Sequence, residues 1–102
     1  MPVNVAINGF GRIGRRILRE ASRNERIRIT AVNDLTAPEV MAHLFKYDSV
    51  HGTFRDEVRL EGNHLKVGRQ DIVLTAERDP SALPWKQLGA DIVLECTGLF
   101  TD

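Results

Sequence analysis

The chain has 102 residues, 42% of them hydrophobic, and its 14 basic and 14 acidic side chains cancel to a formal net charge of zero. This composition suits one small globular domain and excludes a disordered or collagen-like chain. The charge balance argues against a dedicated nucleic-acid or membrane-surface protein, and no apolar run reaches the ~18 residues of a membrane span. The N-terminus does not resemble a signal peptide, so we expect a cytoplasmic protein without a membrane partner.

The most informative pattern lies in residues 3–14. Val3, Val5 and Ile7 predict a strand that runs directly into a G-x-G-x-x-G turn. In such a turn the first glycine permits the tight bend, the second leaves room for a pyrophosphate, and the third lets a helix pack closely on the strand. These are Gly9, Gly11 and Gly14.

A helix is predicted next, over residues 11–22, because apolar residues recur on one face: Ile13, Ile17, Leu18 and Ala21. Its first turn would present backbone N–H groups to a diphosphate. We expect most arginines of this helix to lie on a solvated face. Arg12 is the exception, because it lies inside the glycine turn and can reach a diphosphate.

A second strand is predicted over residues 27–32, and it ends at Asn33 and Asp34. Asp34 stands 20 residues beyond Gly14 (34 − 14), which is the spacing of a dinucleotide-binding fingerprint. A carboxylate at this position can accept hydrogen bonds from the adenosine ribose and would repel a 2′-phosphate. The pattern therefore favours NAD over NADP as the cofactor.

The rest of the chain continues in α/β style. The predicted elements are a helix over 38–46, a hairpin of 57–60 and 64–67 around 61–63, a strand over 72–75, a loop or single helical turns over 79–85, and a strand over 91–96. The last run is apolar and β-branched, which predicts a central parallel strand buried on both faces. Its end brings Thr97 and Gly98 to the edge that carries Gly9 and Asp34.

The sequence contains one cysteine, Cys96, and three histidines, His43, His51 and His64. A single cysteine cannot form a disulfide within the chain, and the histidines lack the paired spacing of metal ligands. We therefore expect no metal site. Cys96 follows a strand of buried character, and a packing role is predicted for it rather than nucleophilic catalysis.

Four segments carry a resemblance to one family, over the whole length of the chain. The chain resembles the N-terminal, NAD-binding part of glyceraldehyde-3-phosphate dehydrogenases, through residues 7–15, 33–35, 45–52 and 95–100. The fold implied is α/β: a Rossmann-type doubly wound parallel sheet, with residues 1–102 forming the first, incomplete portion of the dinucleotide-binding domain and carrying an inserted β-hairpin.

The resemblance also implies roles for individual residues toward NAD. Arg12 and Ile13 would hold the pyrophosphate turn, Asp34 the adenosine ribose, and Arg78 the adenine side. Thr97, Gly98 and Phe100 would lead toward the nicotinamide half. Asn33 belongs to the same motif as Asp34 and is counted with the cofactor-binding residues.

The reaction implied is the oxidation of glyceraldehyde 3-phosphate to an acyl phosphate. A cysteine attacks the aldehyde, hydride passes to NAD, and inorganic phosphate releases the acyl group from the thioester. The family's cysteine stands in a Ser-Cys-Thr-Thr-Asn segment, and neither that segment nor its histidine base occurs in these 102 residues. We therefore expect no catalytic residue and no catalytic domain here, an inactive fragment, and a homotetramer for the intact enzyme.

Three alternatives remain. An erythrose-4-phosphate dehydrogenase shares the architecture but tends to carry glutamate where Asp34 stands. A non-catalytic NAD-binding module is the second, since a fold does not fix a function. RNA binding through the arginine-rich first helix is the third, and the balanced charge disfavours it. Because the last strand would lack later neighbours, the isolated chain is expected to be marginally stable or to self-associate.

Overall fold

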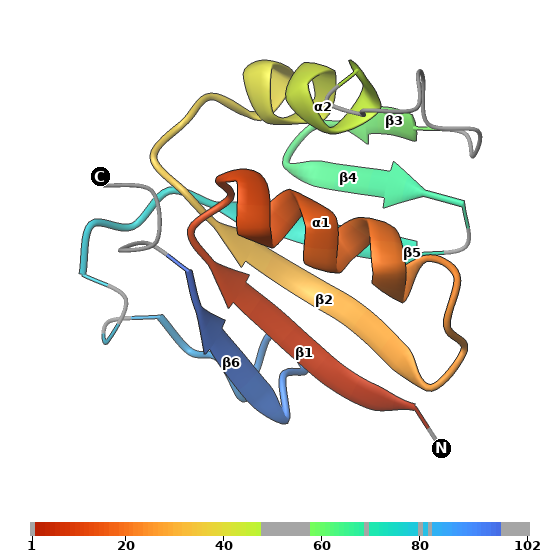
Figure 1. The fold of residues 1–102 in the computed structure, drawn as a ribbon. Coiled ribbons are helices and arrows are strands. Elements are labelled where there is room, and N and C mark those ends of the chain that lie inside the picture. Colours follow the sequence, from red (N-terminus) through yellow and green to blue (C-terminus); the bar gives the residue numbers. More distant parts are fainter. Residues whose placement is uncertain (1, 48–57, 69, 80, 82, 97–102) are drawn as a thin grey trace.

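The computed structural model describes residues 2–47, 58–68, 70–79, 81 and 83–96. Six strands form one sheet in the order β3-β4-β5-β2-β1-β6, accompanied by two helices (Figure 1). The elements are β1 (Val3–Asn8), α1 (Arg12–Ala21), β2 (Ile27–Asn33), α2 (Pro38–Tyr47), β3 (Val58–Glu61), β4 (His64–Val67), β5 (Gln70–Thr75) and β6 (Ile92–Glu95).

The sheet is mixed. Parallel pairing joins β1 to β2, β1 to β6, and β2 to β5, whereas β3, β4 and β5 are antiparallel neighbours. The strand order reverses at β1, since β2 and β5 lie on one side of it and β6 on the other. The predicted α/β sheet of Rossmann type is confirmed, and the hairpin of β3 and β4 is inserted before β5.

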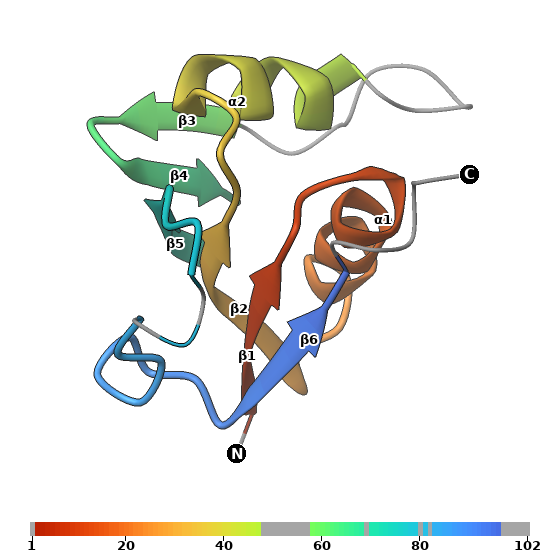
Figure 2. The same ribbon diagram turned by 90° about the vertical axis from the view of Figure 1, so that its left-hand side faces the viewer.

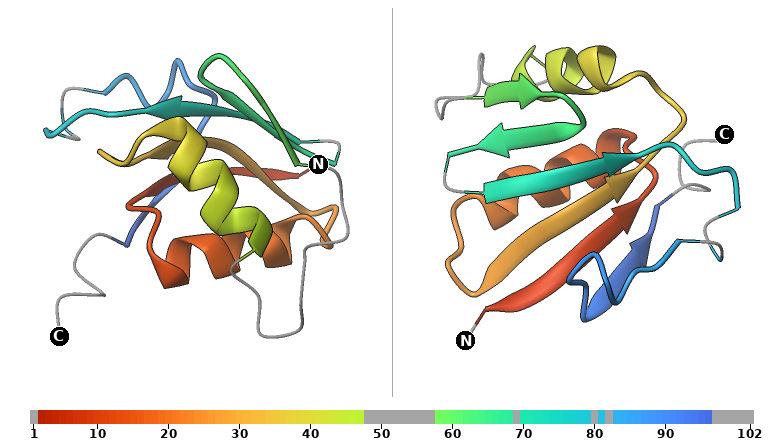
Figure 3. Two further views of the ribbon diagram at one scale, coloured as in Figure 1. Left: turned by 90° about the horizontal axis from the view of Figure 1, so that it is seen from above. Right: turned by 180° about the vertical axis from the view of Figure 1, so that it is seen from behind.

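Both helices lie on one face of the sheet, and the connection from β5 to β6 crosses the opposite face (Figures 2 and 3). Gly11 is the N-cap and Ser22 the C-cap of α1, in agreement with the predicted helix over 11–22. Helix α2 begins at Pro38, whose missing N–H costs nothing at a first helical position. Among the described helices, none is long and apolar enough to cross a membrane.

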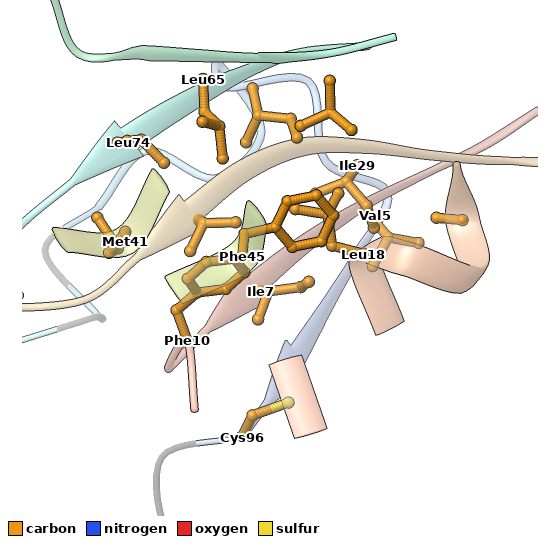
Figure 4. Packing of buried hydrophobic residues seen from close by; sticks show 14 residues of the cluster. Val5, Ile7, Phe10, Leu18, Ile29, Met41, Phe45, Leu65, Leu74 and Cys96 are labelled. Atoms are coloured by element: carbon orange, nitrogen blue, oxygen red, sulfur yellow. The ribbon is translucent and has the colours of Figure 1, made fainter. Parts of the chain in front are cut away.

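The core lies between the helices and the sheet (Figure 4). Leu18 of α1 and Phe45 of α2 are fully buried against Ile7 and Ile29 of the central strands. Burying each such side chain contributes about 1.5–3 kcal/mol relative to leaving it exposed. The Phe10 ring stacks on the Phe45 ring with centroids 6.3 Å apart, so the glycine turn is anchored in this core.

The pairing of β1 with β2 contains a register shift. Val5 lies opposite Ile29, but the next residue, Ala6, lies opposite Ala31, so that Thr30 is an extra residue on β2. Beyond the shift, Asn8 lies opposite Asn33.

Strand β6 differs from the prediction for residues 91–96. It is the edge strand of the described sheet, and Ile92 and Val93 are 48% and 39% exposed instead of buried on both faces. Apolar, β-branched composition predicts a strand but cannot identify its neighbours, because pairing depends on residues elsewhere in the chain. The exposed apolar edge that was expected at the last strand is therefore present, at Ile92 and Val93.

Candidate cofactor-binding site

Two glycines of the turn after β1 are required by geometry. Gly9 has φ of 102°, a conformation that side chains strongly disfavour. A Cβ on Gly14 would lie 2.5 Å from the carbonyl oxygen of Gly9, so only glycine lets α1 approach the turn this closely. Gly11 is extended, with φ of −82° and ψ of −158°, which any residue adopts. Its predicted role, leaving space for a pyrophosphate, stays a prediction.

The N-terminus of α1 is open toward this turn. No side chain caps it and no acidic residue stands in its first turn, while the N–H of Arg15 donates to the carbonyl of Gly11 at 3.0 Å. The N–H groups of residues 12–14 point out of the N-terminal end of the helix, which is the positive end of its dipole. This arrangement suits an anion such as a diphosphate.

The buried face of α1 runs through Gly14, Leu18 and Ala21. Ile13 was predicted to share this face, but it lies about 100° around the helix from Gly14 and is 43% exposed. The prediction was therefore wrong for Ile13. Arg12, also exposed, flanks the open helix end together with Ile13.

Arg15 was predicted to lie on a solvated face, but it is 9% exposed. Its guanidinium Nη1 donates to the carbonyl oxygen of Phe10 at 2.9 Å. The N–H of Phe10 donates in turn to Asp34 Oδ2 at 2.7 Å. Two side chains of opposite charge therefore hold the peptide groups on both sides of Phe10. The apolar periodicity of the helix missed the burial of Arg15, because an arginine next to an apolar face is normally assigned to the solvent-exposed side. The signal available in the sequence was a phenylalanine placed between two glycines.

Asp34 follows β2 and reaches the glycine turn with its carboxylate. Besides the bond from Phe10, its Oδ1 accepts a 2.9 Å bond from the N–H of Thr36. Desolvation is the largest single influence and would raise the pKa of Asp34, but hydrogen bonds from Phe10 and Thr36 and the charge of Arg15 together lower the pKa below its usual value. The carboxylate is therefore ionised at neutral pH beside the turn.

Asn33 is buried, and four bonds occupy its side chain. Its Nδ2 donates to Asn8 Oδ1 and to the carbonyl of Glu77, both at 2.9 Å. Its Oδ1 accepts from Thr75 Oγ1 at 2.7 Å and from the N–H of Glu77 at 2.8 Å. The side chain thus connects β2 to the loop after β5.

The remaining predicted site residues divide into two groups. Arg78 is exposed in the loop after β5, next to Glu77. Thr97, Gly98 and Phe100 lie outside the described residues.

Cys96 directly follows β6 and is 3% exposed. Burial raises the pKa of its thiol, and the neighbouring charge of Glu95 raises it further. A buried, protonated thiol in the apolar cluster agrees with the predicted packing role.

The turn, the open helix end and Asp34 meet at the carboxyl edge of parallel strands, where the strand order reverses. That combination defines a dinucleotide-binding domain of the Rossmann class. Residues 3–102 match the family model described as glyceraldehyde 3-phosphate dehydrogenase, NAD binding domain. The chain belongs to this family, and residues 3–102 correspond to its NAD-binding domain model.

Curated relatives agree with this assignment. The chain is 54% identical over 101 residues to glyceraldehyde-3-phosphate dehydrogenase of Geobacillus stearothermophilus. This alignment covers 99% of this chain and 30% of the relative. It is 56% identical over 104 residues to the enzyme of the same name from Xanthobacter flavus, covering 99% of this chain and 31% of the relative. The chain therefore spans just under a third of the length of these relatives.

Proposed function

We propose that this chain holds the adenosine diphosphate half of NAD in a phosphorylating glyceraldehyde-3-phosphate dehydrogenase. The observation that carries the proposal is the 2.7 Å bond between Asp34 and the N–H of Phe10, which sets an ionised carboxylate beside an open helix N-terminus. A diphosphate on the helix end would leave the adjoining ribose within reach of that carboxylate.

Each predicted residue has a role in this arrangement. The N–H groups in the first turn of α1, with Arg12 and Ile13, hold the pyrophosphate. A carboxylate offers about four acceptor positions, and in the described part of the chain the N–H groups of Phe10 and Thr36 occupy two of those on Asp34. Asp34 can therefore still accept a bond from a ribose hydroxyl. Arg78 borders the adenine.

The nicotinamide side and the chemistry are proposed on the family alone. Thr97, Gly98 and Phe100 would lead toward the nicotinamide. NAD, when bound, supplies the hydride acceptor for oxidation of glyceraldehyde 3-phosphate, with inorganic phosphate as the second substrate. The cysteine nucleophile and its base would come from other parts of the intact enzyme. These 102 residues alone would then be inactive, and the homotetramer and the cytoplasmic location remain part of the proposal.

Cofactor preference tests the role of Asp34. Calorimetric titration of the intact protein that contains these residues should show NAD binding at least about tenfold more tightly than NADP. Asp34→Ala should weaken NAD binding by a similar factor and narrow the difference between the two cofactors. Asp71→Ala is the matched control, because it removes an exposed carboxylate near the start of β5, at the opposite end of that strand from the glycine turn. Equal or tighter binding of NADP by the unsubstituted protein would refute the assignment.

Substrate assays separate the alternatives. The proposal predicts phosphate-dependent NADH formation from glyceraldehyde 3-phosphate in preference to erythrose 4-phosphate. The opposite preference would favour an erythrose-4-phosphate dehydrogenase. NAD binding without turnover of either aldehyde would favour a non-catalytic module.

A further inference from the structure

Polar side chains form a continuous hydrogen-bonded row across the carboxyl ends of β6, β1, β2 and β5. Asn8 Nδ2 donates to Glu95 Oε2 at 2.8 Å, Asn33 Nδ2 donates to Asn8 Oδ1 at 2.9 Å, and Thr75 Oγ1 donates to Asn33 Oδ1 at 2.7 Å. Asn8 and Asn33 are each 3% exposed. The row lies at the same edge of the sheet as the glycine turn and Asp34.

The direction of every bond in this row follows from its anchor on the main chain. The N–H of Glu77 can only donate and its carbonyl can only accept, so Asn33 must present Oδ1 to the first and Nδ2 to the second. Asn33 Nδ2 then requires an acceptor on Asn8, which leaves Asn8 Nδ2 to face the carboxylate of Glu95. One arrangement of the two amides satisfies all partners.

The row has a mechanical consequence for the loop that follows β5. Ladder pairing of β5 with β2 ends at Thr75. Two residues later, the Asn33 side chain binds both the N–H and the carbonyl of Glu77. These two bonds fix the main chain immediately before Arg78.

We propose that Asn33 is a positioning residue for the adenine side of the cofactor site. It acts on the cofactor through Glu77 and Arg78 rather than by its own contact, because its amide is buried and occupied by protein partners. The inference rests on the proposed function, in which Arg78 borders the adenine. Buried amides that satisfy main-chain groups orient the residues beside them, and their loss is felt at the ligand.

A double-mutant cycle on the intact protein tests this, with ADP-ribose as the calorimetric probe. Asn33→Ala should weaken ADP-ribose binding about fivefold. In an Arg78→Ala background the same substitution should have no further effect. If the intact protein turns over, Asn33→Ala should raise KM for NAD and leave kcat unchanged. Gln70→Ala is the matched control, since it removes a side-chain amide that accepts a bond from the main chain of β2 at Ile29 but contacts neither Asn33 nor Glu77, and it should leave the ADP-ribose affinity unchanged.

The outcomes separate the inference from the function on which it rests. Failure of the unsubstituted protein to bind ADP-ribose or NAD, or an Arg78→Ala variant with unchanged affinity, would overturn the proposed site. A normal site with the same fivefold loss from Asn33→Ala in both backgrounds would overturn only the positioning role. Should Asn33→Ala not fold, Asn8→Ala loosens Asn33 from the other side, and its loss of about twofold should likewise vanish in the Arg78→Ala background.

Discussion

Asp34 Oδ2 accepts a hydrogen bond of 2.7 Å from the backbone N–H of Phe10, across 24 positions of sequence. The bond joins the end of β2 to the turn that follows β1. Asp34 therefore holds the turn, in addition to the role proposed for it toward ribose.

The stability contributed by Asp34 should depend on pH in a defined direction. Its folded pKa is lowered, so its contribution is complete above the unfolded value of about 3.9 and is lost as the pH falls through the folded pKa. Urea unfolding of the dilute 102-residue chain should show a difference between wild type and Asp34→Asn that shrinks below about pH 4. A difference that stays constant from pH 6 to pH 2.5 would contradict this explanation.

Arg15 should matter more for stability than its neighbour Arg16. Arg15→Met leaves the buried carbonyl of Phe10 without its guanidinium partner, and this should cost about 1–3 kcal/mol in the free energy of unfolding. Arg16→Met changes an exposed side chain and should cost less than about 0.5 kcal/mol. Denaturant titrations of both variants provide the comparison. Equal losses in the free energy of unfolding would refute the role of Arg15 in holding the Phe10 carbonyl.

Gly14→Ala and Gly62→Ala should separate crowding from backbone strain. At Gly14 a methyl group would meet the Gly9 carbonyl oxygen at 2.5 Å, so the turn or the helix must move, at a cost of about 1–3 kcal/mol. The NAD affinity of Gly14→Ala should fall together with its stability. Gly62 has φ of 63° and open space around it, so alanine there should cost about 1 kcal/mol through strain alone. Calorimetry should find the NAD affinity of Gly62→Ala unchanged.

The exposed edge of β6 should make the isolated 102-residue chain self-associate. Ile92→Lys places a charge on this edge strand and should shift sedimentation profiles toward monomer. Val40→Lys is a control of equal starting exposure, 48% in both cases, on α2 instead of the sheet edge. It should leave association unchanged. A monodisperse wild-type monomer with one cooperative thermal transition would count against the prediction.

Local patterns were sufficient for most of the fold. The apolar periodicity located α1 and α2 to within a residue or two, and β-branched runs before the glycine turn and before Asp34 located β1 and β2. These signals are short-range, because helix and strand propensities depend on the residue itself and its neighbours along the chain.

The missing parts depend on partners far along the chain. The burial of Arg15 requires the carbonyl of Phe10 in its particular turn, and the bonds of Asn33 to Glu77 span 44 positions. The edge position of β6 likewise depends on which strands pair with it. No periodicity encodes such contacts, since they arise only when the sheet is assembled.

The extra residue at Thr30 decides which side chains arrive at the cofactor edge. If β2 kept all its residues and continued in step from the pairing of Val5 with Ile29, Asn8 would face Val32. Because the shift leaves Thr30 unpaired, Asn8 faces Asn33 instead, and the N–H of Gly9 donates to the Asn33 carbonyl. A regular ladder over the same residues would keep every chemical group of the site in the chain and still bring the wrong one to the turn.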